Sequence, residues 1–222
     1  MSTVLFLGGS RGIGAALVAR HLDQGDRVIA TARDDAALAR LRGLGVHQAL
    51  RVDVADAASI SGLAWPLDGE KIDIALYVAG VTSPGDATQP PTSEAFDTVM
   101  HANVLGAMQA IPQVAPLLAP GGRFGFVSSV MGRIATVDNS RAWVYRTSKA
   151  ALNMAVASAQ SAWPNAIMVC LHPGWVQTDM GGGAAPVTPE ASASGLRRVM
   201  AALTPADRGA YIQYDGQRFD TW

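Results

Sequence analysis

The sequence of 222 residues has little cysteine, no excess of either charge and no long apolar run. Its single cysteine, Cys170, cannot form an internal disulfide, which favours a reducing compartment and a cytoplasmic location. The formal net charge is −1 and no lysine or arginine cluster is present, so we expect neither nucleic acid nor membrane as a partner. No apolar stretch reaches the roughly 18 residues of a spanning helix. The first ten residues carry no basic leader, so we predict no signal peptide.

Short apolar runs alternate with longer helical patterns along the whole chain. Strands are expected at 3–7, 27–32, within 47–54, at 72–80, 122–129 and 166–174, and within 209–216. Helices are expected at 12–25, 35–45, 58–67, 93–119 and 190–203, and one more helix is expected to contain Tyr145 and Lys149. Near-continuous apolar strands that alternate with helices indicate a parallel sheet covered on both faces. We therefore predict the α/β class, with residues 1–222 as one doubly wound domain of about seven parallel strands. Ligands of such sheets bind beyond the carboxyl ends of the strands.

A glycine-rich turn follows the first expected strand. In "LGGSRGIG", Gly8, Gly12 and Gly14 stand between this strand and an apolar helix. Glycines allow a close backbone approach, and a helix N-terminus offers unpaired N–H groups to a pyrophosphate. The turn therefore predicts a dinucleotide site in a Rossmann-type fold, and an ordinary strand-to-helix turn is the alternative.

The end of the second expected strand favours NADP(H) over NAD(H). Dinucleotide folds that read a free ribose 2′-hydroxyl place a carboxylate there, whereas this chain has Ala32 and then Arg33, with Asp34 and Asp35 only afterwards. Arg33, together with Arg11 of the glycine turn, can pair with a 2′-phosphate. The alternative is that both arginines are solvated surface residues.

Asp53 follows the third expected strand, in "RVDVAD". Its carboxylate is placed to accept a hydrogen bond from the adenine amino group. A helix-capping role is the alternative for this residue.

Tyr145 and Lys149 lie at positions i and i+4 of an expected helix, which places them on one helix face. A free tyrosine has a pKa of about 10, too high for ready proton exchange at neutral pH. A nearby ammonium group, and the positive nicotinamide ring of an oxidised cofactor, stabilise the phenolate and lower that pKa. The pair therefore predicts a tyrosine general acid or base, with core packing as the alternative for the tyrosine.

The order of several motifs resembles that of the classical short-chain dehydrogenase/reductase family. These motifs are "GGSRGIG", "AG" at 79–80, "HANVLG", "VSS", "YRTSK" and "HPGWVQT". The resemblance covers essentially the whole chain. The segments "WVYRTSKAALNM" and "HPGWVQTDMGG" are similar to those of the short C-factor-like subgroup, which includes small carbonyl reductases.

The resemblance implies a catalytic set of Asn103, Ser129, Tyr145 and Lys149. Ser129 would hold the substrate oxygen, Lys149 would also bind the nicotinamide ribose, and Asn103 would hold a water in a proton relay behind the lysine. The cofactor set that the glycine turn and the resemblance imply together is Gly8, Ser10, Arg11, Gly12, Ile13, Gly14, Arg33, Asp53, Val54, Ala79, Gly80, Tyr145, Lys149, Pro173, Gly174, Val176 and Thr178. No metal ligand is assigned, and His172 is interpreted as structural.

The chain departs from the family pattern at four places. Leu7 stands where the family usually has threonine, and Tyr77 and Val78 stand where it usually has two asparagines, which puts sheet details in doubt. The 16-residue separation of Ser129 and Tyr145 is longer than usual, so residues 133–143 should bulge over the site. The loop at 181–189 is short, which predicts an open site. Ser128 is the alternative to Ser129 as the serine that holds the substrate oxygen. The candidates for an apolar pocket wall are Val130, Trp143, Trp175 and Met180.

These features predict an NADPH-dependent oxidoreductase that acts on a small or medium carbonyl compound. The alternatives are a non-enzymatic NADP(H)-binding regulatory protein of the C-factor type and another nucleotide-binding α/β enzyme. The resemblance also implies a homodimer or homotetramer.

Overall fold

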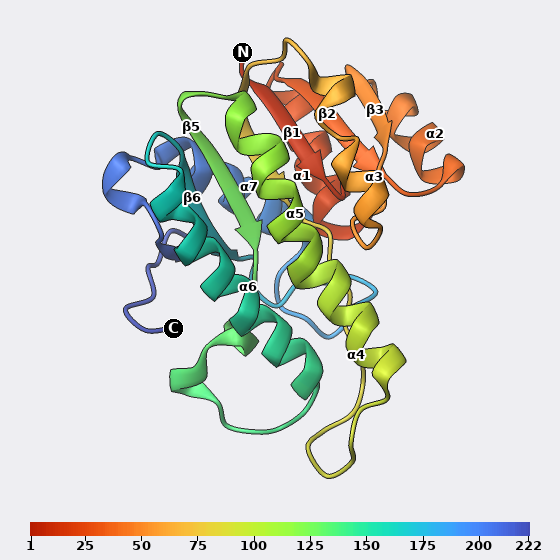
Figure 1. Cartoon of the computed structure of the whole chain (residues 1–222), viewed down its shortest axis with the longest axis vertical. Coiled ribbons are helices and arrows are strands. Elements are labelled where there is room, and N and C mark those ends of the chain that lie inside the picture. The colour runs from red at the N-terminus through yellow and green to blue at the C-terminus, as the bar shows by residue number, and fades with distance from the viewer.

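The computed structural model describes residues 1–222 and contains one sheet with helices on both sides (Figure 1). The strands are β1 (Thr3–Leu7), β2 (Arg27–Ala32), β3 (Gln48–Arg51), β4 (Ile72–Tyr77), β5 (Leu118–Val127), β6 (Ile167–His172) and β7 (Tyr211–Gln213). The helices are α1 (Gly12–Asp23), α2 (Asp35–Gly43), α3 (Ala57–Ser61), α4 (Ser93–Met100), α5 (Gly106–Val114), α6 (Trp143–Ala162) and α7 (Pro189–Ala202).

The seven strands lie in the order β3-β2-β1-β4-β5-β6-β7, and each neighbouring pair is parallel. The predicted doubly wound α/β fold is therefore confirmed. The chain moves outward from β1 to β3 and then returns to place β4 against the other side of β1. This reversal is the topological switch point, and a ligand is expected beyond the carboxyl ends of β1 and β4.

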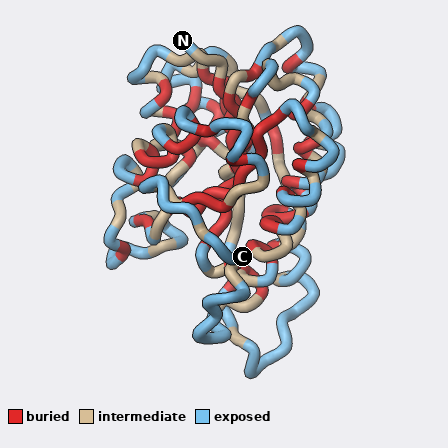
Figure 2. Tube along the Cα trace, turned by 90° about the vertical axis from the view of Figure 1, so that its left-hand side faces the viewer, coloured by how far each residue is buried: buried red, intermediate tan, exposed pale blue.

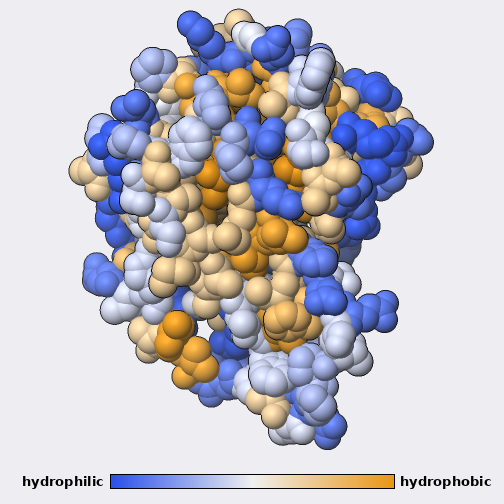
Figure 3. Space-filling model, in the orientation of Figure 1, coloured by the Kyte–Doolittle hydropathy of each residue, from blue (hydrophilic) through white to orange (hydrophobic).

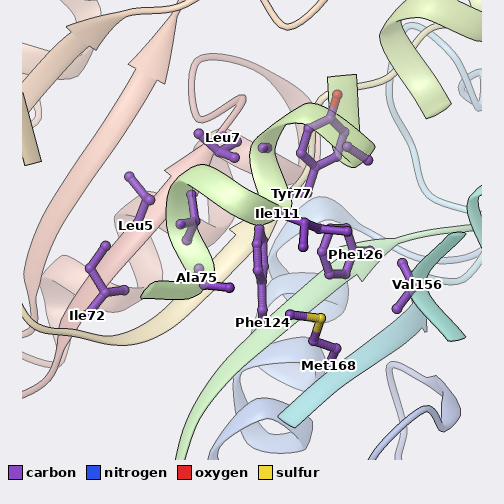
Figure 4. Packing of buried hydrophobic residues seen from close by; sticks show 14 of the residues in the cluster. Leu5, Leu7, Ile72, Ala75, Tyr77, Ile111, Phe124, Phe126, Val156 and Met168 are labelled. Carbon is purple, nitrogen blue, oxygen red and sulfur yellow. The ribbon is translucent and has the colours of Figure 1, made fainter. Parts of the chain in front are cut away.

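Two apolar layers cover the two faces of the sheet. One contains α1, α2 and α7, with residues such as Leu17, Leu41 and Leu196. The other contains α3, α5 and α6, and Figure 4 shows its centre, where Phe124 and Phe126 pack with residues of β4 and β6. In Figure 2 the buried segments run through the middle of the molecule. The strands are apolar on both faces because both faces are covered.

The predicted helical stretch at 93–119 is not one regular α-helix. It consists of α4, a π-helix at His101–Leu105, α5 and a 3₁₀ turn at Ala115–Leu117. The stretch expected at 58–67 likewise divides into α3 and a 3₁₀ turn at Trp65–Leu67. The apolar pattern predicts helical backbone in both places, but it does not show where the hydrogen-bond ladder changes.

Two loops extend beyond the carboxyl ends of the strands, at 82–92 and at 130–142 (Figure 1). The backbone N–H of Ala142 donates to the carbonyl of Gly85 at 2.7 Å, which joins the two loops. Ala142 has a φ of 53° and is the only non-glycine residue with a positive φ. No helix of the structure combines the length and apolarity that crossing a membrane requires.

Candidate active site

A single large cleft opens at the carboxyl edge of the sheet, with a volume of about 1670 Å³. Its lining includes every residue that the sequence assigns to the cofactor, and also Ser129. Among the predicted catalytic and cofactor-binding residues only Asn103 does not line the cleft, because its side chain is fully buried. Residues from seven separate segments of the sequence therefore meet at the switch point.

The glycine turn between β1 and α1 fits a pyrophosphate. A Cβ on Gly14 would lie 2.1 Å from the carbonyl oxygen of Gly8, so this tight turn requires a glycine. The helix α1 has no side-chain cap and no acidic residue in its first turn. Its first N–H groups and its dipole are thus available to an anion at the cleft.

Arginines surround the cleft at the carboxyl end of β2. Arg11, Arg33 and Arg40 line it, and no salt bridge is formed by any of them. The two acids that follow Arg33 have other partners. Asp34 caps α2 by accepting from the N–H of Ala37 at 2.8 Å, and Asp35 pairs with Arg51. This end of the cleft is therefore suited to a phosphate group.

Asp53 lines the cleft but caps no helix. The helix α3 is capped by Asp56, whose side chain accepts from the N–H of Ala58 at 2.9 Å. Asp53 uses Oδ1 to accept from the N–H of Ala55 at 2.9 Å, which forms a short turn. The helix-capping alternative for Asp53 is therefore wrong.

Tyr145 lies in the first turn of α6 and is 9% exposed. Burial raises the pKa of its phenol, and the nearby Ser129 hydroxyl lowers it by a smaller amount. The lowering of the Tyr145 pKa that the sequence predicts is therefore absent from the protein alone. Burial of the phenol is the largest influence on this pKa.

Lys149 is buried one helical turn after Tyr145. Its Nζ donates to the carbonyl of Val127 at 2.8 Å and lies 5.6 Å from the centre of the Tyr145 ring. Burial lowers the pKa of this lysine to about 8, and the neighbouring Cys170 acts in the opposite direction. The ammonium group is therefore the main form at neutral pH, but it loses its proton more readily than a solvated lysine.

Asn103 lies in the π-helix and is held by two other segments. Its Oδ1 accepts from the N–H of Val81 at 2.8 Å, and its Nδ2 donates to the carbonyl of Val81 at 2.8 Å. Nδ2 also donates at 2.9 Å to Ser148, whose hydroxyl donates to the carbonyl of Tyr145 at 2.7 Å. The side-chain amide thus joins the π-helix, the loop after β4 and α6.

The two candidate serines have different surroundings. Both serines line the cleft and both are buried. The Ser128 hydroxyl donates to Asn153 Oδ1 at 2.6 Å, whereas the Ser129 hydroxyl lies beside Tyr145. A 3₁₀ turn at Val130–Gly132 begins directly after Ser129, and Ser129 Oγ accepts from the N–H of Met131 at 3.2 Å. The geometry therefore favours Ser129 as the serine that reaches a substrate.

The walls beyond Tyr145 come from the two joined loops and from the segment after β6. Val130, Trp175 and Met180 line the cleft, but Trp143 does not. Burial lowers the pKa of His172 to about 4, so this residue is neutral at pH 7, and its ring lies beside Phe219.

Several residues that the sequence analysis did not identify contribute to the site. Arg40, Arg141, Ala142 and Arg146 also line the cleft. The "YRTSK" motif contains Arg146 but gives no reason to place it there.

Comparison with known proteins agrees with this geometry. The sequence profile of the short chain dehydrogenase family matches residues 2–186. The 1-hydroxy-2-glutathionyl-2-methyl-3-butene dehydrogenase of Rhodococcus sp. (strain AD45) is 33% identical over 97% of this chain and 98% of its own length. The C-signal of Myxococcus xanthus is 36% identical over 65% of this chain and 90% of that protein. A carbonyl reductase from Pseudomonas aeruginosa PAO1, solved in complex with NADP, superposes with a TM-score of 0.84 at 28% identity and covers 100% of both chains. The chain belongs to the short-chain dehydrogenase family.

Proposed function

We propose that this protein is an NADPH-dependent reductase that converts a small or medium carbonyl compound to an alcohol, reversibly. The observation that carries the proposal is the meeting of Ser129, Tyr145 and Lys149 in the same cleft as the glycine turn. The oxidoreductase family and the NADP-bound carbonyl reductase neighbour support it. The whole chain, residues 1–222, would act as one domain.

Bound NADPH would supply the hydride. The protein would bind and orient the substrate and would protonate its carbonyl oxygen. The Ser129 hydroxyl holds the carbonyl oxygen of the substrate and donates to it as negative charge develops there. Tyr145 then gives its phenolic proton to this oxygen. Because burial raises the pKa of Tyr145, the phenol is protonated at neutral pH and is ready to act as an acid. The charged Lys149 stabilises the phenolate that remains.

The preference for NADPH over NADH rests on the arginines at the end of β2. Arg11, Arg33 and Arg40 line the cleft there, and the nearby Asp34 and Asp35 carboxylates are engaged elsewhere. A 2′-phosphate would thus meet three arginines there, and the one carboxylate beside them in the cleft, Asp34, is used to cap α2.

The substrate region is open. The segment after β6 contributes Trp175 and Met180, which are both exposed, and adds no covering helix before α7. We infer that the natural substrate is a ketone or aldehyde of small or medium size with some apolar surface. The name of the Rhodococcus relative gives a 1-hydroxy compound, which supports chemistry between an alcohol and a carbonyl group.

The first test is a titration with NADPH and NADH, followed by a panel of ketones, aldehydes and diketones. Tyr145→Phe should reduce turnover by about a thousandfold or more, because the proton donor is lost, and should keep NADPH binding. Unchanged turnover in Tyr145→Phe would contradict the mechanism. A regulatory protein that binds NADP(H) without chemistry would instead bind NADPH and oxidise it with no member of the panel.

A further inference from the structure

Tyr77, the last residue of β4, is the clearest departure from the family pattern within the core. Its side chain is fully buried in the apolar layer that contains Phe126 and Ile111. Figure 4 shows its ring among these apolar side chains and its oxygen directed away from them, toward a helical segment. The hydroxyl donates to the carbonyl of Ala102 at 2.6 Å. This is a buried hydrogen bond between the sheet and the π-helix.

The hydrogen-bond pattern of the π-helix explains why this carbonyl needs a partner. In a regular α-helix the N–H of Gly106 would donate to the carbonyl of Ala102, four residues before. Here it donates to the carbonyl of His101, five residues before. The Ala102 carbonyl therefore loses its usual helical donor, and the Tyr77 hydroxyl replaces it. A buried carbonyl without a donor is destabilising, so the hydrogen bond from Tyr77 stabilises this wider turn.

The space around the hydroxyl is built for this contact. A Cβ on Gly106 would lie 2.5 Å from the Tyr77 oxygen and 2.3 Å from the carbonyl oxygen of Val54. Only glycine at position 106 lets the phenol reach the helix. Burial, and to a smaller degree the charge of Asp53, raise the pKa of Tyr77, so the phenol remains a neutral donor.

The same turn carries Asn103, the residue next to Ala102. The side chain of Asn103 holds Val81 and Ser148, and Ser148 holds the Tyr145 carbonyl. A Cβ on Gly80 would lie 3.1 Å from Asn103 Oδ1 and 3.4 Å from Lys149 Nζ, so both groups lie against the same backbone atom. A shift of the π-helix would therefore move Asn103 away from Lys149. It would also disturb Ser148, whose hydroxyl holds the Tyr145 carbonyl.

We propose that Tyr77 is a positioning residue for the reaction, which acts through the Ala102 carbonyl to hold Asn103 beside Lys149 and α6. This inference rests on the proposed reductase function. The phenol does not line the cleft in which the cofactor and the substrate are proposed to bind. It stands where the family usually has asparagine, and its hydroxyl contacts the backbone of the π-helix.

The test compares Tyr77→Phe with Tyr211→Phe. Both substitutions remove one hydroxyl from a buried tyrosine of the same apolar layer, but the Tyr211 hydroxyl makes no main-chain hydrogen bond. Tyr77→Phe should lower kcat by about tenfold to a hundredfold, since small misplacements have such effects, while KM for NADPH stays near its wild-type value. Tyr211→Phe should keep the wild-type kcat. Unchanged kcat in Tyr77→Phe, or an equal loss in both variants, would overturn the proposal.

A double-mutant cycle separates positioning from general loosening. If Tyr77 acts through Asn103, then Tyr77→Phe should cause little further loss of kcat in an Asn103→Ala background. If the kcat losses of the two single variants multiply in the double variant, Tyr77 does not act through Asn103, and the proposal is overturned.

Hydrogen exchange supplies a readout that does not depend on turnover. The amides of residues 104–107 should exchange faster in Tyr77→Phe than in the wild type, and unchanged exchange there would overturn the proposal. If the wild type reduces no compound, the reductase function fails, and exchange still decides whether Tyr77 holds the π-helix.

Discussion

Ser128 and Ser129 are adjacent in the sequence, but their hydroxyl groups have different hydrogen-bond partners. Ser129→Ala should lower kcat by about a hundredfold or more, because the donor to the substrate oxygen is lost. Ser128→Ala should keep most of the activity and should mainly lower stability, because Ser128 bonds to Asn153 inside the core. Steady-state kinetics and thermal unfolding of both variants check this prediction. The opposite order of kcat losses would assign the substrate contact to Ser128.

The pKa of Lys149 predicts the pH dependence of reduction. Because burial lowers this pKa to about 8, the ammonium group is present below pH 8 and is lost above it. We expect kcat/KM for carbonyl reduction to fall as the pH rises through about 8. The pKa of Lys149 is lower in the folded state than in the unfolded chain, so its contribution to stability rises between pH 8 and 10.5. Loss of a proton from Lys149 therefore cannot cause alkaline unfolding. A flat profile to pH 9.5, with the fold intact, would contradict the prediction.

We predict that the preference for NADPH over NADH depends on Arg33. Arg33→Ala should weaken NADPH binding by about tenfold to a hundredfold, because a charged hydrogen bond contributes about 1.5–3 kcal/mol, and should change NADH binding little. Arg42→Ala is the control, because Arg42 is exposed on the same segment and does not line the cleft. Fluorescence titration with both coenzymes measures the effect. Equal losses for NADPH and NADH would exclude a 2′-phosphate contact for Arg33.

Residue types and their order were sufficient to predict the cofactor-binding residues that line the cleft, but not Arg40, Arg141 or Arg146. Tyr145 and Lys149 could be predicted because their chemistry needs a fixed spacing on one helix. The contact of Tyr77 could not be predicted, because its partner is a carbonyl that is free only in a π-turn. The raised pKa of Tyr145 also depends on burial, which is a property of the assembled core.

At the scale of elements, the turn after β5 packs directly against α6. A Cβ on Gly132 would lie 2.7 Å from the Lys149 carbonyl carbon and 2.8 Å from Lys149 Cβ. Gly132→Ala should push this turn away from α6 and separate Ser129 from Tyr145, so kcat should fall by about tenfold or more. Gly43→Ala is the control, because nothing lies within 4 Å of the added Cβ in α2. Wild-type kinetics for Gly132→Ala would show that the two elements are not held this tightly.

Most elements follow from apolar periodicity, and the exceptions have local causes. The strand expected at 122–129 begins earlier, at Leu118, where the pairing of β4 and β5 shifts register between Ile72 and Ile74. Sequence patterns do not contain such pairing information, because it depends on the neighbouring strand.

At the scale of the whole molecule, cofactor binding should stabilise the fold. A ligand at 100 times its Kd adds about 2.7 kcal/mol to the free energy of unfolding. For a chain of this length that corresponds to a rise in Tm of about 5 to 10 °C. Thermal unfolding with and without NADPH measures it, with NADH at the same concentration as the control. A rise that is no larger with NADPH than with NADH would contradict the predicted preference.

We also propose a homodimer or homotetramer that pairs through α5 and α6. Figure 3 shows apolar atoms gathered over the middle of this face, and Met108 and Met154 are 53% and 69% exposed. Sedimentation should show an oligomer at micromolar concentration, and Met108→Glu with Met154→Glu should shift it toward the monomer. A wild-type monomer under these conditions would reject the proposal.

The cytoplasmic location stays a prediction.

The hydrogen bond from Ala142 to Gly85 has a consequence for protein engineering. The loops 82–92 and 130–142 come from different crossovers, but this bond makes them a single structural unit at the mouth of the cleft. A chimera that receives only one of them from a relative would lose the match between their backbones. To redirect substrate choice in this scaffold, the two loops would have to be transplanted as a pair.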